Sequence, residues 1–217
     1  MKSNLPPELY QTMLDFYNQH KDSRNTEEFP RTDAVIEGSK QSREPPTLVF
    51  LNENIMNTMA QVLQPLVEHW CKCKLERTAI YGIREYYRGN ILRNHVDRVA
   101  THVISVIIQV DQDLGGAEDW LLEVIDYKGK RQHVKLLPGE MLLYESAKLI
   151  HGRPAMFKGR RFANAFMHFR PITGWDYTTG EDNAFFFSRQ KNLREPLENL
   201  FTDLTAGKKV FEVKNEL

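Results

Sequence analysis

Three side chains of this chain have the types and spacing needed to bind one metal ion. His95 and Asp97 stand two residues apart, and on an extended strand such positions point to the same face. His151 offers a third donor from far along the chain. Two imidazoles and one carboxylate form the facial triad of non-haem iron, which leaves coordination positions open for a cosubstrate and dioxygen. We therefore predict that His95, Asp97 and His151 hold iron(II) and form the catalytic centre.

A His-x-Asp pair carries little weight by itself, because such tripeptides arise by chance, so the third ligand matters. The other histidines are assigned to structural roles. His69, His102 and His133 lack a histidine and a carboxylate partner at suitable spacing. Of these, His102 is near enough to the motif in sequence to be a rival ligand.

Two arginines follow the last predicted ligand at the start of an apolar segment. Arg160 and Arg161 lie nine and ten residues after His151 and precede the run 162–169. A dicarboxylic acid that chelates the metal through one end leaves a distal carboxylate, which a fixed guanidinium can bind in a bidentate manner. Either arginine is a candidate, because sequence alone specifies strand register poorly.

These residues need a scaffold that brings distant segments together. The chain has 217 residues, of which 41% are hydrophobic, so it can form one sizeable core. We predict a single domain with a helical N-terminal layer (1–77), a strand-rich core (78–171) and a C-terminal extension (172–217).

Two amphipathic helices are predicted in the N-terminal layer, separated by a loop over 21–46. Pro6 and Pro7 suit a first helical turn. The apolar face of this helix is Leu9, Met13, Phe16 and Tyr17. Asn52 can cap the second helix, which Pro65 is expected to kink. Its apolar stripe is predicted to be Ile55, Met59, Val62, Leu63, Leu66 and Trp70.

The remainder of the chain is typical of many short strands. β-branched and aromatic runs alternate with Gly, Pro and Asp turns, which favours an antiparallel sandwich or jelly roll braced by helices. The predicted strands are 79–87, 102–110, 121–127, 131–136, 141–144 and 160–169. A short C-terminal helix is predicted at Pro196, with Leu197, Leu200 and Leu204 as its apolar face.

Charge and cysteine content restrict the partners and the setting. Lys and Arg number 29, as do Asp and Glu, so no net field favours nucleic acid or an anionic membrane. Cys71 and Cys73 fall in a helical pattern, so neither a disulfide nor a soft-metal site is expected. The N-terminus has no apolar run of signal-peptide length and no segment approaches a membrane span, so we expect a cytoplasmic protein.

From Tyr81 to Pro171 the chain resembles the prolyl 4-hydroxylase branch of the iron(II)- and 2-oxoglutarate-dependent dioxygenases. The matching motifs are Tyr86-Tyr87-Arg88-Gly89, His95-Val96-Asp97, Gly115-Gly116, Pro138-Gly139-Glu140, His151-Gly152-Arg153-Pro154 and Gly159-Arg160. The N-terminal helices are similar to those of a subgroup that extends this core.

The resemblance implies a mainly β fold with flanking helices (α+β), whose core is a double-stranded β-helix, also called a jelly roll or cupin-like fold. It implies Fe(II) at the triad, 2-oxoglutarate as cosubstrate and dioxygen as oxidant, with ascorbate as an additional cofactor. It also implies a basic residue for the distal carboxylate. We prefer Arg160, whose strand face carries Asn164, Phe166 and His168, over Arg161.

Two further positions are predicted to face the cosubstrate from the resemblance. Tyr86 matches a tyrosine that faces cosubstrate or substrate, although strand packing explains it equally well. Gln109 stands where many relatives have a hydrogen-bonding tyrosine, and it can still donate a hydrogen bond. Leu92 stands where many relatives have another such tyrosine, and its side chain cannot form a hydrogen bond.

The predicted activity is hydroxylation of an unactivated carbon, with a prolyl residue in a peptide or protein as the first candidate substrate. A free amino acid or another small metabolite is the alternative, and a non-catalytic metal-binding jelly roll is a third reading. An extended peptide would need a groove beside the metal, bordered by the loop 21–46 and by Arg153. No nucleic-acid or membrane partner is expected.

Overall fold

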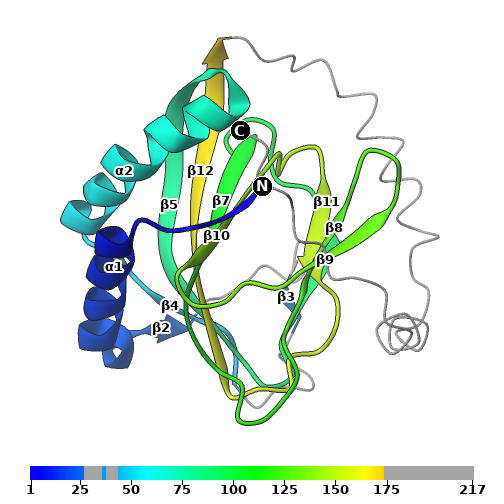
Figure 1. Cartoon of the computed structure of the whole chain (residues 1–217). Coiled ribbons are helices and arrows are strands. Elements are labelled where there is room, and N and C mark those ends of the chain that lie inside the picture. Colours follow the sequence, from blue (N-terminus) through cyan, green and yellow to red (C-terminus); the bar gives the residue numbers. More distant parts are fainter. Residues whose placement is uncertain (27–35, 38–43, 174–217) are drawn as a thin grey trace.

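Two antiparallel sheets and two helices make up the described part of the chain. A computed structural model describes residues 1–26, 36–37 and 44–173 (Figure 1). The sheets form separate layers, and both helices lie on one side of the larger sheet (Figure 1). The predicted mainly β fold with flanking helices is therefore confirmed. The predicted C-terminal helix after Pro196 lies outside the described residues.

The larger sheet carries the helices, and the smaller sheet faces its other side. In order across the larger sheet, the strands are β1 (Lys2–Asn4), β10 (Glu140–Tyr144), β7 (Ile104–Asp113), β12 (Arg161–Thr173), β5 (Lys74–Tyr87), β4 (Thr47–Val49) and β2 (Asn25–Thr26). The smaller sheet runs β3 (Ile36–Glu37), β6 (Ile91–His95), β11 (Ile150–Arg153), β8 (Leu122–Ile125) and β9 (Arg131–Val134).

The first helix, α1 (Pro7–His20), forms as predicted. Pro7 lies in its first turn, where a missing backbone N–H costs no hydrogen bond. Its buried face is Leu9, Met13, Phe16 and Tyr17. A short 3-10 helix, η1 (Lys21–Ser23), follows α1 directly.

The second helix, α2 (Glu53–Cys71), is capped by Asn52, whose side chain accepts a hydrogen bond from the Ile55 backbone N–H at 3.0 Å. Its buried residues are Ile55, Met59, Leu63 and Val67. The predicted stripe was wrong at Leu66, which is 43% exposed. Val67 takes the inward position, because it continues the i, i+4 row of Met59 and Leu63.

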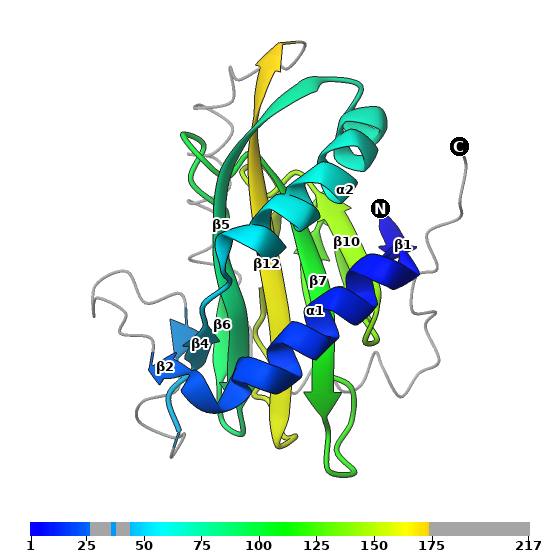
Figure 2. The same cartoon turned by 90° about the vertical axis from the view of Figure 1, so that its left-hand side faces the viewer.

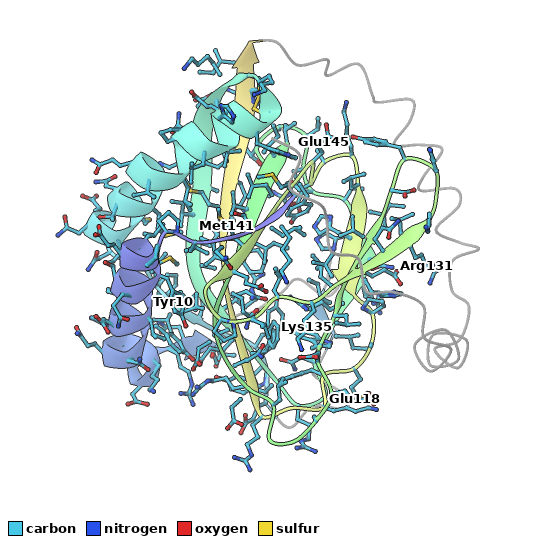
Figure 3. All side chains as sticks on the ribbon, viewed as in Figure 1. Tyr10, Glu118, Arg131, Lys135, Met141 and Glu145 are labelled. Atoms are coloured by element: carbon cyan, nitrogen blue, oxygen red, sulfur yellow. A yellow bond between two sulfur atoms is a disulfide. The ribbon has the colours of Figure 1, made fainter. Side chains whose placement is uncertain are left out.

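The two faces of β12 separate the helix side from the space between the sheets. Ala163, Ala165 and Met167 belong to the core cluster that includes α1 and α2 residues. Both helices cross this face (Figure 2). Because side chains alternate along a strand, Phe162 and His168 point to the smaller sheet. Side chains fill the space between the sheets (Figure 3).

Several strand boundaries differ from the predicted ones. β5 begins at Lys74 and β12 continues to Thr173, whereas β8 ends at Ile125. Two short strands of the smaller sheet, β6 and β11, were missed as separate elements, although they carry His95 and His151. Each has only four or five residues, too few for a periodic pattern.

The expectation that Cys71 and Cys73 form no disulfide was wrong. The structure joins them, with 5.3 Å between their Cα atoms. α2 ends at Cys71, and Lys72 adopts a left-handed conformation with φ of 55°. This turn brings the Cys73 side chain back toward Cys71, which a continuing helix would not allow.

Neither helix in the described ranges has the length and apolar content needed to cross a membrane.

Candidate metal centre

Two neighbouring strands of the smaller sheet bring the three predicted ligands together. β6 and β11 pair antiparallel, and His95 and His151 are direct partners in the register. The Asp97 backbone N–H donates to the Ser146 carbonyl at 2.9 Å, which holds the segment just after β6. One donor atom from each of His95, Asp97 and His151 lies within 4.8 Å of the others. No other group of this kind occurs among the described residues.

The donor atoms are the two histidine Nε2 atoms and one carboxylate oxygen. Asp97 Oδ1 lies 3.5 Å from His95 Nε2 and 3.9 Å from His151 Nε2. Each imidazole is oriented by its other nitrogen: Nδ1–H of His95 donates to the Arg93 carbonyl at 2.8 Å, and Nδ1–H of His151 donates to the Leu149 carbonyl at 2.9 Å. Such bonds fix the tautomer and leave Nε2 unprotonated for a metal. The donor set therefore fits a divalent cation.

Burial and neighbouring charges keep two of the groups in the protonation state that metal binding requires. Burial favours the neutral form of Asp97, but the neighbouring His95, His151 and His168 outweigh it and hold the carboxyl pKa below its ordinary value. Burial, together with the nearby His95, lowers the pKa of His151 to about 4. A carboxylate and a neutral imidazole are the ligand forms that a cation binds.

His168 on β12 lies next to Asp97 from the opposite sheet. Its Nδ1 lies 3.8 Å from Asp97 Oδ2 and is hydrogen-bonded to Ser105 Oγ at 2.7 Å. Burial lowers the pKa of His168 to about 3. The sequence predicts His168 on an inward strand face but indicates no role for it, because its neighbour Asp97 follows a strand of the other sheet.

His102 does not join the ligand group. Its Nε2 lies 3.0 Å from the Tyr81 hydroxyl, and its ring stacks on His168 with 3.9 Å between centroids. The prediction that His102 is structural agrees with these contacts. His133 pairs with Glu123 at 3.4 Å on the other face of the smaller sheet.

Neither predicted arginine reaches the ligand group. Arg160 precedes β12, its side chain is 68% exposed, and its Nη1 lies 3.4 Å from Asp113 Oδ2. Arg161 points to the helix side, where its Nη2 pairs with Asp111 at 2.5 Å and its guanidinium lies over the Tyr17 ring.

A different arginine is buried beside the metal ligands. Arg153 on β11 is 1% exposed, and its Nη1 donates to the Trp120 carbonyl. Its guanidinium lies 4.5 Å from the ring centroid of Phe162 and 5.1 Å from that of Trp120. Burial lowers the pKa of Arg153 to about 10, so it stays charged at neutral pH. The sequence-based prediction for Arg153 was a position at the border of a peptide groove. The missed signal was its position two residues after His151 on one strand.

Gln109 and Tyr86 are both fully buried. Gln109 Oε1 accepts a hydrogen bond from Asn164 Nδ2 at 2.5 Å, which links β7 to the inward face of β12. The Tyr86 ring meets Trp120 edge-on, with 5.0 Å between centroids, in a cluster with Phe157 and Phe162. Tyr86 also interacts electrostatically with Arg153.

Comparison with known proteins supports the fold. No family model and no curated protein matches the sequence. Among solved structures, a prolyl-4-hydroxylase from Pseudomonas putida matches with a TM-score of 0.54 at 12% identity, covering 78% of this chain and 91% of that one. A prolyl hydroxylase from Trichoplax adhaerens matches with a TM-score of 0.57 at 12% identity, covering 85% of this chain and 86% of that one. That structure is a complex with a peptide fragment of the hypoxia inducible factor oxygen degradation domain.

A third structure extends the same likeness. AviO1 from Streptomyces viridochromogenes matches with a TM-score of 0.53 at 13% identity, covering 81% of this chain and 91% of that one. The chain thus has the fold of the prolyl hydroxylases. The resemblance noted in the sequence motifs is confirmed at the level of the fold.

Proposed function

We propose that this chain is an iron(II)- and 2-oxoglutarate-dependent oxygenase that hydroxylates an unactivated carbon. The observation that carries the proposal is the convergence of His95, Asp97 and His151, each of which offers one ligand atom within 4.8 Å of the other two. Two imidazoles and one carboxylate are the ligand set of non-haem iron oxygenases. The likeness of the fold to prolyl hydroxylases supports the same conclusion.

The two sheets are assigned to a double-stranded β-helix, with the ligands on the smaller sheet facing the larger one. This arrangement accounts for ligands from β6 and β11 and a supporting histidine from β12. It also accounts for the helices on the outer face of the larger sheet, where they cover apolar side chains that would otherwise meet water.

The side chains have separate tasks in this proposal. His95, Asp97 and His151 hold the metal, and the carbonyls that accept from the two Nδ1–H groups fix the ring orientations. An aromatic cluster, formed by Tyr86, Trp120, Phe157 and Phe162, excludes water from one end of the space between the sheets. Bound iron(II) would supply the redox chemistry, with dioxygen as the oxidant: one oxygen atom would go to the substrate, and the other would go to succinate as 2-oxoglutarate loses carbon dioxide.

A prolyl residue in a peptide is the proposed substrate. The Trichoplax neighbour is described as a prolyl hydroxylase in complex with a peptide, which supports an extended peptide as the partner here. Proline-rich peptides and free proline are the two arms of the substrate test. We expect mass spectrometry to detect one added oxygen on the peptide, and exclusive hydroxylation of free proline would contradict the peptide assignment.

The activity itself is tested without a substrate. Many oxygenases of this kind convert some cosubstrate when substrate is absent, so wild-type protein with iron(II), 2-oxoglutarate and air should release succinate. We expect His95→Ala and Asp97→Ala to abolish succinate release and Mn(II) binding. The matched control is His69→Ala, an exposed histidine near the end of α2. Normal succinate release by either ligand variant would contradict the proposal.

A further inference from the structure

Arg153 is a buried cation without a carboxylate beside it among the described residues. Its Nη1 donates to the Trp120 carbonyl, but its Nη2 has no hydrogen-bond partner within the described ranges. The side chain is 1% exposed, and its guanidinium is charged at neutral pH. A buried and incompletely bonded charge is unfavourable unless an opposite charge pairs with it, and a ligand anion would supply that partner here.

The surroundings of Arg153 favour an anion over a further protein contact. Aromatic rings of Trp120 and Phe162 line the guanidinium and limit its movement. Tyr86 and Tyr144 lie close enough to interact with it electrostatically, and a phenol can donate a hydrogen bond to the same anion. A planar cation with aromatic walls and nearby hydroxyl groups is well suited to bidentate recognition of a carboxylate.

The position of Arg153 relative to the metal ligands sets the size of the ligand. His151 and Arg153 are two residues apart on β11, which corresponds to about 6–7 Å along a strand. Tyr144 on β10 lies near both, because its hydroxyl is 3.2 Å from His151 Nε2 and it interacts electrostatically with Arg153. A five-carbon dicarboxylic acid chelating the metal at one end can therefore direct its other end to Arg153.

The two alternative arginines, Arg160 and Arg161, already pair with carboxylates, and neither side chain points into the space between the sheets. Arg160 is at the surface beside Asp113, and Arg161 pairs with Asp111 on the helix side of the larger sheet. The sequence motif predicts the carboxylate-binding arginine at the start of β12, whereas the arginine buried between the sheets is Arg153 on β11.

We propose that Arg153, and neither Arg160 nor Arg161, binds the distal carboxylate of the 2-oxo acid cosubstrate. This inference rests on the proposed function, since it assumes a 2-oxo acid chelated at His95, Asp97 and His151. It places the carboxylate subsite on the same strand as the last metal ligand. The cosubstrate would then lie along the smaller sheet and leave the inward face of β12 for the substrate.

The test compares two ligands that differ only in the distal group. 2-Oxopentanoate has the length of 2-oxoglutarate but ends in a methyl group. Binding of each acid to the Mn(II)-loaded full chain is measured by calorimetry, which needs no turnover. We expect wild type to prefer 2-oxoglutarate by about 10- to 100-fold, the range for hydrogen bonds to a charged group.

Arg153→Met should remove this preference by weakening only 2-oxoglutarate, with 2-oxopentanoate binding unchanged. Arg160→Met and Arg161→Met are the matched controls and should keep the wild-type preference. Loss of the preference in Arg160→Met or Arg161→Met, but not in Arg153→Met, overturns the proposal.

A conservative variant separates ligand binding from folding. Arg153→Lys keeps a buried cation but loses the bidentate geometry, so we expect a reduced preference with unchanged Mn(II) affinity. An unchanged preference in this variant overturns the assignment of Arg153 alone. If wild type binds Mn(II) but neither 2-oxo acid, the proposed function fails together with this inference.

Discussion

His151 and Arg153 lie on the same strand with Gly152 between them, and both side chains lie close to Tyr144. A predicted metal ligand and a buried cation are thus held at a fixed separation by one short stretch of backbone. β11 also changes register against β6 between these two residues, which re-aims side chains locally. The geometry of this segment therefore controls both ends of the proposed cosubstrate site.

The glycine between them is expected to be essential for close packing of β11 on β6. A Cβ at Gly152 would lie 2.6 Å from Asn94 Oδ1 and 2.8 Å from the carbonyl oxygens of Arg93 and Leu92. We expect Gly152→Ala to destabilise the protein by about 1–3 kcal/mol and to weaken Mn(II) binding, because β11 must move away from β6. Urea denaturation and Mn(II) titration measure the two effects.

Gly116→Ala is the control for this substitution. Nothing lies within 4 Å of a Cβ at Gly116, but its φ of 84° makes a side chain unfavourable there. It should lower stability through backbone strain alone and leave Mn(II) affinity unchanged. Equal Mn(II) affinities for Gly152→Ala and wild type would show that the close approach does not position the ligands.

His168 is expected to hold Asp97 in place from the larger sheet. Its Nδ1 lies 3.8 Å from Asp97 Oδ2 and bonds to Ser105. Residues that orient a ligand typically contribute 10- to 100-fold to metal affinity. We expect His168→Gln to weaken Mn(II) binding by about that factor in a titration. His69→Gln, at an exposed position, should bind as wild type does, and an unchanged affinity in His168→Gln would exclude the positioning role.

Glu123 is expected to make stability depend on pH in the acid range. Burial favours its neutral form, but His133, Asn94 and Arg131 outweigh this and lower the carboxyl pKa below its ordinary value of 4.5. The folded state therefore binds protons less readily than the unfolded state. This stabilisation is complete above about pH 4.5 and is lost as pH falls through the folded-state pKa.

Glu123→Gln tests this pH dependence. We expect the variant to be about 1–3 kcal/mol less stable at pH 7, with a difference that shrinks as pH falls below 4.5. Urea denaturation at several pH values measures it, and Glu118→Gln, at an exposed position away from the helices, is the control (Figure 3). A difference that grows toward acid pH would contradict the assignment.

A buried carboxylate joins α1 to the larger sheet on the side away from the metal ligands. Glu85 is fully buried and accepts hydrogen bonds from Tyr17 at 2.5 Å, Tyr87 at 2.6 Å and Thr47 at 2.8 Å. We expect Tyr17→Phe to reduce the free energy of unfolding by about 1.5–3 kcal/mol, since a charged acceptor loses a donor. Mn(II) affinity should not change.

Tyr10→Phe, on the same helix, controls for loss of a hydroxyl and should change stability by less than about 0.5 kcal/mol. The double variant Tyr17→Phe with Glu85→Gln should be more stable than the sum of the single effects implies, because the two groups interact directly. Additive effects in thermal denaturation would mean that the hydrogen bond contributes nothing measurable.

Local features of the sequence were sufficient to predict several parts of the molecule. The spacing of Met13, Phe16 and Tyr17 indicated the buried face of α1, since helical periodicity depends only on neighbouring turns. The pair His95 and Asp97, with His151, was recognised as a ligand set from residue types and order alone. Residue types determine which metal chemistry is available, and the structure brings these three side chains together.

Other features depend on where an element ends and on what packs against it. Leu66 fitted the helical pattern but faces solvent, and the Cys71–Cys73 disulfide depends on where α2 ends. The proposed carboxylate subsite is the strongest case: Arg160 has the spacing of the family motif, yet it precedes β12 and points to the surface.

The sequence by itself determined the ligand types, the helices and the mainly β character, because each follows from chemistry or periodicity within a short stretch of chain. Only the tertiary structure decided which arginine lies buried near the ligands. That choice depends on where β12 begins and how β11 pairs with β6, because a shift of one residue turns every side chain of a strand to its opposite face.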